Sequence, residues 1–226
     1  MELMFDNANL ETLTRFTEIY PYVGVTSNPT IIKAEGKLDF FAHMKNIRAL
    51  IGKERSLHIQ VVSTNAADIV NEANKIAERI DKDVYIKIPV TEEGLKAIKI
   101  LKAKNFKITA TAIYTKIQGL LAIAAGADYI APYFNRIEKR GENPSDIIAA
   151  FRADIDFGGA STKILAASFH SGEQVLKALH AGADCVTLQP KLLQEMLCAD
   201  YIDNAVNVFA QDWKNSQGFE NLLDCE

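Results

Sequence analysis

The chain has 226 residues, of which 48% are hydrophobic and 24% charged, and its formal net charge is -4 at pH 7. This composition is typical of a globular protein with a sizeable core, and the acidic balance with scattered lysines and arginines argues against nucleic-acid binding. No run of about eighteen apolar residues occurs, and the opening segment MELMFDNANL lacks the basic and long apolar parts of a signal peptide. We therefore expect no membrane partner and a cytoplasmic location.

Short apolar segments alternate with amphipathic ones from one end of the chain to the other. The expected strands are residues 3–6, 24–26, 57–62, 84–88, 107–112, 129–132, 163–167 and 185–188. Each is followed by a stretch with apolar residues three and four positions apart, as at Leu95, Ile98 and Leu101, which is the spacing of one helix face. The pattern is therefore a strand and a helix repeated eight times.

Several helix boundaries have sequence signals. Start signals are Thr91 before EEGLKAIK, Asn143 followed by Pro144, and Ser171 with Gln174 in capping-box spacing. Stop signals are Gly126 after residues 118–125 and Gly182 after residues 174–181. These signals place the helices between the expected strands.

Eight alternating units predict a parallel sheet that is either doubly wound or closed into a barrel. Their number and the chain length favour a single (β/α)8 TIM-barrel domain, with the barrel at about residues 1–200. No GxGxxG or P-loop segment follows an expected strand, which counts against the nucleotide-binding doubly wound fold. A ninth helix at about 203–215 precedes a polar tail, and its apolar residues suggest a subunit contact.

The cysteines and histidines follow no metal-site pattern. Cys185, Cys198 and Cys225 are odd in number and lack metal-ligand spacing, so they are most simply reduced thiols. The four histidines are dispersed, without an HxxxH or HxH pair. We expect neither a metal nor another cofactor.

Polar residues stand at or just after the ends of the expected strands. In a (β/α)8 barrel the active site lies at the C-terminal ends of the strands. Seven strands bring such residues to this end: Asp6, Thr26, Asn28, Gln60, Lys87, Thr111, Tyr133, Arg136 and Ser168. The alternative for any one of them is a cap or turn residue that meets solvent. Gln60 and Lys87 fit that alternative least, because apolar strand residues flank both.

Lys87 interrupts an apolar run in the segment DVYIKIPVT. Strand alternation places Tyr85, Lys87 and Pro89 on one face and an all-aliphatic set on the other, so we expect Lys87 to point into the barrel. Burial disfavours the charged form of an amine, and a neutral amine is the nucleophile that forms an imine with a carbonyl substrate. The alternative is a buried ion pair between Lys87 and Asp6 without chemistry.

Five segments together carry a resemblance to a known family. They are GVTSNPTII (24–32), KIPVTEEGLKAIK (87–99), TATAIY (109–114), APYFNRI (131–137) and LAASF (165–169). In this order they resemble the small transaldolase-like class I aldolases, over a range that ends at about Trp213. The resemblance implies a metal-independent (β/α)8-barrel enzyme in which Lys87 forms a Schiff base with a sugar phosphate.

Two positions resemble the aldolase branch of this family rather than its transaldolases. The transaldolases usually carry glutamate where Gln60 stands and phenylalanine where Tyr133 stands. The implied reaction is the reversible cleavage of fructose 6-phosphate to dihydroxyacetone and glyceraldehyde 3-phosphate, with Tyr133 moving protons through a water held by Gln60 and Thr111. The alternatives are a transaldolase that passes the dihydroxyacetone unit between sugar phosphates, and a sugar-phosphate-binding barrel without catalysis.

The resemblance also implies roles in substrate binding. Asp6 and Asn28 would hold donor hydroxyls, with Asp6 also transferring protons during imine formation, and Thr26 would line the same pocket. Arg136 and Ser168 match the positions that bind the acceptor's phosphate, where a guanidinium and a hydroxyl can hold several oxygens. Without the motif, Arg136 would be read as part of a surface salt bridge.

Expectations also follow for two histidines and for the quaternary structure. His170 stands where family members often carry lysine or arginine, and an imidazole is only partly charged at neutral pH, so phosphate affinity is expected to fall as pH rises. His58 shares a face with Gln60 and is expected to be a satisfied interior histidine. The resemblance further implies a homodecamer of two stacked five-membered rings, in which the last helix packs on a neighbouring subunit.

Overall fold

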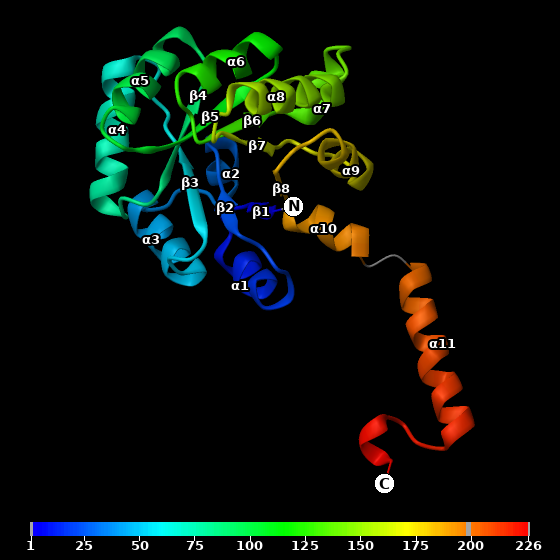
Figure 1. Ribbon diagram of the computed structural model, residues 1–226. Helices are drawn as coiled ribbons and strands as arrows, with labels where there is room; N and C mark the ends of the chain where they lie inside the picture. The colour runs from blue at the N-terminus through cyan, green and yellow to red at the C-terminus, as the bar shows by residue number, and fades with distance from the viewer. Residues whose placement is uncertain (1, 198–199, 226) are drawn as a thin grey trace. The chain divides into compact units, whose positions relative to one another are not determined.

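The computed structural model describes residues 2–197 and 200–225. The chain divides into two compact units, a barrel unit that ends at Pro190 and a C-terminal unit that begins at Lys191. In the barrel unit eight parallel strands close into a barrel in chain order, and Figure 1 shows its helices outside the strands. This confirms the expected (β/α)8 barrel followed by an extra C-terminal helix.

The strands lie where the sequence predicts them, with ends that differ by at most two residues. They are β1 (Glu2–Asp6), β2 (Gly24–Thr26), β3 (Ser56–Gln60), β4 (Tyr85–Pro89), β5 (Lys107–Ile113), β6 (Tyr129–Pro132), β7 (Lys163–Ala166) and β8 (Cys185–Leu188). The helices of this unit are α1 (Leu10–Ile19), α2 (Pro29–Ala34), α3 (Phe40–Ile51), α4 (Ala66–Arg79), α5 (Glu92–Lys102), α6 (Lys116–Ala124), α7 (Phe134–Lys139), α8 (Pro144–Gly158) and α9 (Gly172–His180).

The strand register decides which side chains share the barrel interior. Asp6 pairs with Thr26, and Lys87 pairs with Gln60 on one side and Thr109 on the other. Paired residues of parallel strands project to the same face of the sheet, so these five side chains point into the barrel together. The inward orientation expected for Lys87 is therefore confirmed.

Side-chain caps fix the helices that lead away from the site. The hydroxyl of Thr91 caps α5 and the carboxamide of Asn143 caps α8, as expected. Ser171 accepts from the backbone N–H of Gln174, but the Gln174 carboxamide accepts from the N–H of His170 rather than from that of Ser171. Only half of the expected capping box is formed, and the other half fixes the backbone at His170 instead.

Two glycines end helices at the expected positions. Gly126 follows α6 with φ 83°, and Gly182 follows α9 with φ 104°. This left-handed region is costly for residues with a Cβ, so glycine allows the chain to turn directly into the next strand. Each turn is short, which keeps β6 and β8 close to the helices that precede them.

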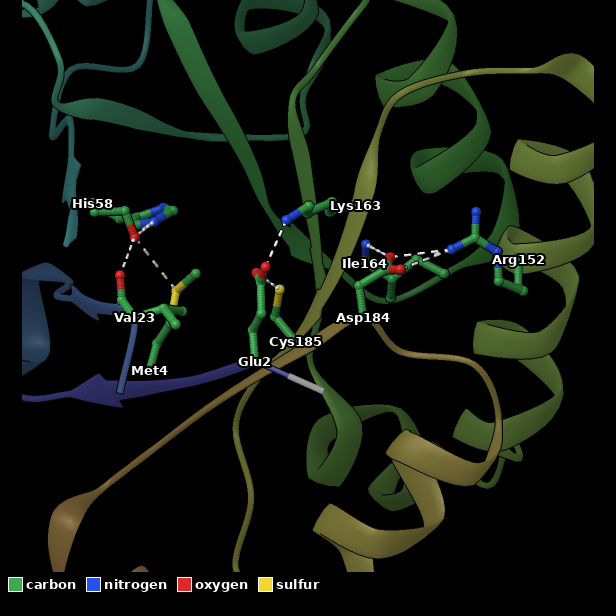
Figure 2. A network of polar contacts seen from close by, with 10 residues as sticks. Glu2, Met4, Val23, His58, Arg152, Lys163, Ile164, Asp184 and Cys185 are labelled. Carbon is green, nitrogen blue, oxygen red and sulfur yellow. Dashed lines mark hydrogen bonds and ion pairs between the residues drawn. The ribbon is translucent and has the colours of Figure 1, made fainter. Parts of the chain in front are cut away.

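Ion pairs and a buried thiol lie at the N-terminal ends of the strands. The carboxylate of Glu2 accepts from the Lys163 amine at 2.8 Å and from the Cys185 thiol at 2.9 Å (Figure 2). Burial, together with the neighbouring Glu2 carboxylate, raises the pKa of Cys185, so this thiol stays protonated. Arg152 on α8 contacts the Asp184 carboxylate at 3.0 Å, which ties the helix layer to the start of β8.

The C-terminal unit consists of helical segments. They are α10 (Pro190–Leu197), which begins at the division, α11 (Asp200–Gln217) and a 3-10 turn, η1 (Leu222–Asp224). The expected ninth helix thus extends further at both ends than residues 203–215, and none of its residues is buried. Its exposed large apolar side chains are Tyr201, Val206, Val208 and Phe209.

The described part of the chain contains no helix that is both long and apolar enough to cross a membrane. Cys225 in the C-terminal unit is exposed, and both it and Cys185 are free cysteines. Cys198 lies outside the described residues. That the cysteines are reduced thiols stays a prediction.

Candidate active site

A cavity of about 410 Å³ opens at the C-terminal ends of the strands. Seven of the nine predicted site residues line it: Asp6, Asn28, Gln60, Lys87, Tyr133, Arg136 and Ser168. The other two, Thr26 and Thr111, are fully buried and lie behind side chains of the cavity wall. We call this the site cavity.

Lys87 provides an amine at the base of the site cavity. The residue is only 2% exposed, and its Nζ donates to the backbone carbonyl of Ser27 at 3.3 Å. Among the described residues Lys87 makes no ion pair with Asp6, so the alternative of a purely structural ion pair is not formed. The amine lines the site cavity, where it can reach the carbonyl carbon of a bound substrate.

Asp6 is held in place by a chain of hydroxyl groups. The Thr26 hydroxyl donates to Asp6 Oδ1 at 2.7 Å and lies 2.7 Å from the Thr187 hydroxyl. The resemblance implied that Thr26 lines the pocket. In the structure its hydroxyl instead contacts the Asp6 carboxyl from behind. Burial raises the pKa of Asp6, although the charge of Lys87 and the Thr26 hydrogen bond oppose the rise. A carboxyl with a raised pKa keeps its proton more readily, and imine formation needs a proton donor at the carbonyl oxygen.

Replacing Asp6 by asparagine is expected to stabilise the fold at pH 7. A raised pKa means that the folded state binds this proton more tightly than the unfolded state, so stability is lost as pH rises through the folded pKa. The variant avoids that loss, and its Tm should rise by roughly 2–4 °C for each kcal/mol recovered. Calorimetry across pH checks this: the gain should shrink toward about pH 4, and a gain that is independent of pH would contradict it.

Tyr133 presents its phenol to the site cavity between a hydroxyl and a cation. Thr111 Oγ1 donates to the phenol oxygen at 3.0 Å, and the Arg136 guanidinium carbon lies 5.0 Å from the ring centroid. Both contacts fix the position of the Tyr133 ring in the cavity wall. The amide oxygen of Gln60 is buried and has no partner among the described residues, so it can accept from a substrate hydroxyl or a water.

Polar groups at the mouth of the site cavity come from helix starts and a strained turn. Asn28 caps α2 by accepting from the N–H groups of Thr30 and Ile31, which leaves its amide N–H groups to donate to a ligand. Ser168 has φ 64°, a left-handed conformation that costs a residue with a Cβ about 1 kcal/mol or more. Arg136 donates Nη1–H to the Tyr114 hydroxyl at 3.0 Å and joins no surface salt bridge among the described residues.

His58 lies in the barrel interior and is fully buried. One ring nitrogen lies 2.7 Å from the Thr109 hydroxyl and the other 2.9 Å from the Ser56 hydroxyl, while the ring stacks on Tyr85. Burial, aided by the charge of Lys87, lowers the pKa of His58 to about 3. The imidazole is neutral at physiological pH, which confirms the expectation of a satisfied interior histidine.

The sequence reasoning missed several residues of the site, of which Thr187 and Tyr114 form hydrogen bonds with predicted site residues. Thr187 lines the site cavity from the end of β8, and alternation from the inward Cys185 could have identified it. Tyr114 also lines it, although it follows β5 at a position that alternation does not place inward. An extra residue in β5 explains the second case.

The fold and the site cavity define the class of protein: a single-barrel enzyme with a buried lysine as its candidate nucleophile. The family model described as Transaldolase/Fructose-6-phosphate aldolase matches residues 3–220, and the chain belongs to this family. It is 47% identical over 213 residues to a Streptococcus pneumoniae protein named "Probable fructose-6-phosphate aldolase". The aligned residues cover 94% of this chain and 96% of that relative. The protein is therefore an enzyme of the aldolase and transaldolase type, as the resemblance implied.

Proposed function

We propose that the protein is a class I aldolase that cleaves and forms fructose 6-phosphate through a Schiff base on Lys87. The observation that carries this proposal is the buried amine of Lys87 at the base of a polar cavity, with the Tyr133 phenol in the cavity wall. The name of the Streptococcus pneumoniae relative supports the choice of substrate. The proposed products are dihydroxyacetone and glyceraldehyde 3-phosphate.

The first step joins the substrate to the enzyme. The neutral amine of Lys87 attacks C2 of the open-chain sugar, and loss of water gives an imine. Asp6, with its raised pKa, supplies the proton that lets the C2 hydroxyl leave as water. Once protonated, the imine withdraws electrons from the neighbouring C3–C4 bond.

The second step breaks that bond. Tyr133 takes the proton of the C4 hydroxyl, through a water when one is held by Gln60, and C4 becomes the aldehyde carbon. The electron pair of the C3–C4 bond moves into the imine and leaves an enamine on Lys87. The hydrogen bond from the Thr111 hydroxyl positions the phenol oxygen of Tyr133 for this transfer. Thr111 thus acts on Tyr133 directly.

The third step regenerates the enzyme. Tyr133 returns a proton to C3 of the enamine, and water hydrolyses the resulting imine to release dihydroxyacetone and free Lys87. Arg136 and Ser168 hold the phosphate of the aldehyde product at the mouth of the site cavity. His170 lines the same mouth. Its expected effect on phosphate affinity stays a prediction.

A transaldolase is the second candidate function, because the family includes both activities. The two reactions share every step up to the enamine on Lys87. They differ in whether the enamine takes a proton or attacks a second aldehyde, such as erythrose 4-phosphate. The phenol of Tyr133 can supply that proton, which favours the aldolase.

Fructose 6-phosphate alone is expected to be cleaved, with dihydroxyacetone and glyceraldehyde 3-phosphate appearing in equal amounts. Adding erythrose 4-phosphate should change the rate of fructose 6-phosphate loss little, because protonation and hydrolysis free Lys87 without an acceptor. Chromatographic measurement of all four compounds checks both statements. Turnover that strictly requires erythrose 4-phosphate would overturn the aldolase assignment in favour of the transaldolase.

We propose further that the active form is a homo-oligomer, the decamer of two five-membered rings that the resemblance implied. The exposed apolar residues of α11 support an association of this kind, because a helix with such residues gains from covering them. Sedimentation velocity of the full chain measures the assembly, and a monomer at assay concentration would overturn it. The cytoplasmic location stays a prediction.

A further inference from the structure

Tyr114 makes the polar contact that holds Arg136 at the mouth of the site cavity. Its phenol oxygen accepts the Nη1–H of Arg136 at 3.0 Å. Its ring also meets the Tyr133 ring edge to face, with centroids 5.6 Å apart. Arg136, Tyr133 and Tyr114 therefore form one contact group, in which the cation lies over one ring and bonds to the hydroxyl of the other.

A bulge in β5 places Tyr114 in this group. Ala110 pairs with Ile130 and Ile113 with Pro132, so two residues of β5 stand opposite one residue of β6. The second of the two, Ala112, has φ 55°, which is costly for a residue with a Cβ. The extra residue reverses the alternation, because every side chain after it changes face. Tyr114 consequently lines the site cavity.

Gln118 on α6 makes three hydrogen bonds with its carboxamide that hold the backbone around Ala112. Its amide nitrogen donates to the backbone carbonyls of Val90 at 3.1 Å and Ala112 at 3.3 Å. Its amide oxygen accepts from the backbone N–H of Tyr114 at 2.9 Å. These contacts join β4, the bulge and α6, so the backbone that carries Tyr114 is held before any ligand arrives.

The hydrogen bond to Tyr114 matters because Arg136 is otherwise an exposed, long side chain. Such a side chain loses rotamer freedom when it binds a ligand, at about 0.5–1.5 kcal/mol, which corresponds to roughly two- to twelvefold in affinity. Tyr114 takes one N–H of the guanidinium and leaves the remaining donors for the oxygens of a phosphate. The restriction is thus already present in the free enzyme.

We propose that Tyr114 is a positioning residue that sets the preference for phosphorylated over unphosphorylated aldehydes by fixing Arg136 against the Tyr133 ring. The inference rests on the proposed function, in which Arg136 binds the phosphate of the aldehyde. Tyr114 acts through Arg136 and needs no contact with the reacting carbon atoms. It changes the affinity for the phosphorylated aldehyde and not the making or breaking of the carbon–carbon bond.

Aldol addition of dihydroxyacetone to glyceraldehyde 3-phosphate and to glyceraldehyde tests this. The preference is the ratio of the two kcat/KM values. In Tyr114→Phe, which keeps the ring packing on Tyr133, this ratio is expected to fall about three- to tenfold. The fall should come from a higher KM for glyceraldehyde 3-phosphate, with its kcat within about twofold of the parent value. Tyr20→Phe, which removes a phenol hydroxyl on the α1 side outside the site cavity, should leave the ratio unchanged.

The double variant separates positioning from a general structural role. Arg136→Gln should lower the ratio strongly by itself, and adding Tyr114→Phe should lower it no further, because Tyr114 then has no guanidinium to hold. An unchanged ratio in Tyr114→Phe, an equal loss with both aldehydes, or an additive loss in the double variant would overturn the inference. A parent enzyme whose ratio does not respond to Arg136→Gln would instead count against the phosphate site of the proposed function.

Discussion

Replacing Lys87 by methionine is expected to lower fructose 6-phosphate cleavage by about 10⁴-fold or more. The substitution keeps the apolar stem and removes the amine, so the covalent step loses its nucleophile while the cavity keeps its shape. Methionine also places apolar atoms where a polar group is buried, so the variant should melt at no lower temperature than the parent. Steady-state kinetics and calorimetry on the same sample measure both effects.

Borohydride reduction tests the covalent intermediate directly. With dihydroxyacetone present, the parent chain should gain the mass of one reduced three-carbon unit, located on Lys87 by peptide mapping. The matched control is Lys96→Met, which removes an exposed amine on α5 and should neither lower activity nor prevent the modification. Parent enzyme that stays unmodified on Lys87, or a Lys87→Met enzyme that keeps its activity, would exclude the Schiff-base mechanism.

The position of Lys87 could be predicted because β4 is regular. Alternation within a regular strand fixes the face of each residue, and an all-aliphatic opposite face identifies the side that meets the helices. Ile86 and Ile88 are fully buried there, as expected. The same rule would have added Thr187 had it been applied to β8, since that strand is regular as well.

The position of Tyr114 could not be predicted in this way. A bulge is an extra residue relative to the neighbouring strand, and it appears only when two strands are paired. The residue with positive φ is Ala112, whereas glycine or asparagine is the usual sequence signal of that conformation. The alternation of TATAIY therefore predicts the wrong face for every residue after the bulge.

The sequence also could not predict how deeply each inward side chain lies in the barrel. Thr26 and Asp6 both stand at strand ends, yet the hydroxyl of Thr26 is buried behind the carboxyl of Asp6 because the two strands are in register at these residues. Strand order gives neighbours, whereas register and stagger give the layer that each side chain occupies.

The short helices α2 and α7 were not predicted as separate helices, because six residues are too few to show a helical period.

The electrostatics around Lys87 form a consistent picture with the proposed chemistry. His58 is neutral because burial lowers its pKa to about 3, and Asp6 resists ionisation because burial raises its pKa. A neutral His58 places no second positive charge beside the Lys87 amine. The carbonyl of Ser27 orients the amine without neutralising a charge.

Replacing Tyr133 by phenylalanine is expected to lower the release of dihydroxyacetone from fructose 6-phosphate by about 10²–10⁴-fold, the usual effect of losing a general acid or base. Bond cleavage should slow as well, because the C4 hydroxyl loses its proton acceptor. Release should slow more, because protonation of the enamine at C3 also depends on the phenol. The ratio of transfer to release, measured with erythrose 4-phosphate present, should therefore rise.

The matched control for this variant is Tyr129→Phe. Tyr129 comes from the same strand, β6, but belongs to the buried core cluster with Met4, Leu165 and Cys185, and it does not line the site cavity. Loss of its hydroxyl should leave both rates near those of the parent. If Tyr133→Phe lowers transfer and release by the same factor, the phenol moves protons without deciding the fate of the enamine. The preference for the aldolase would then depend on how the cavity excludes or admits the second aldehyde.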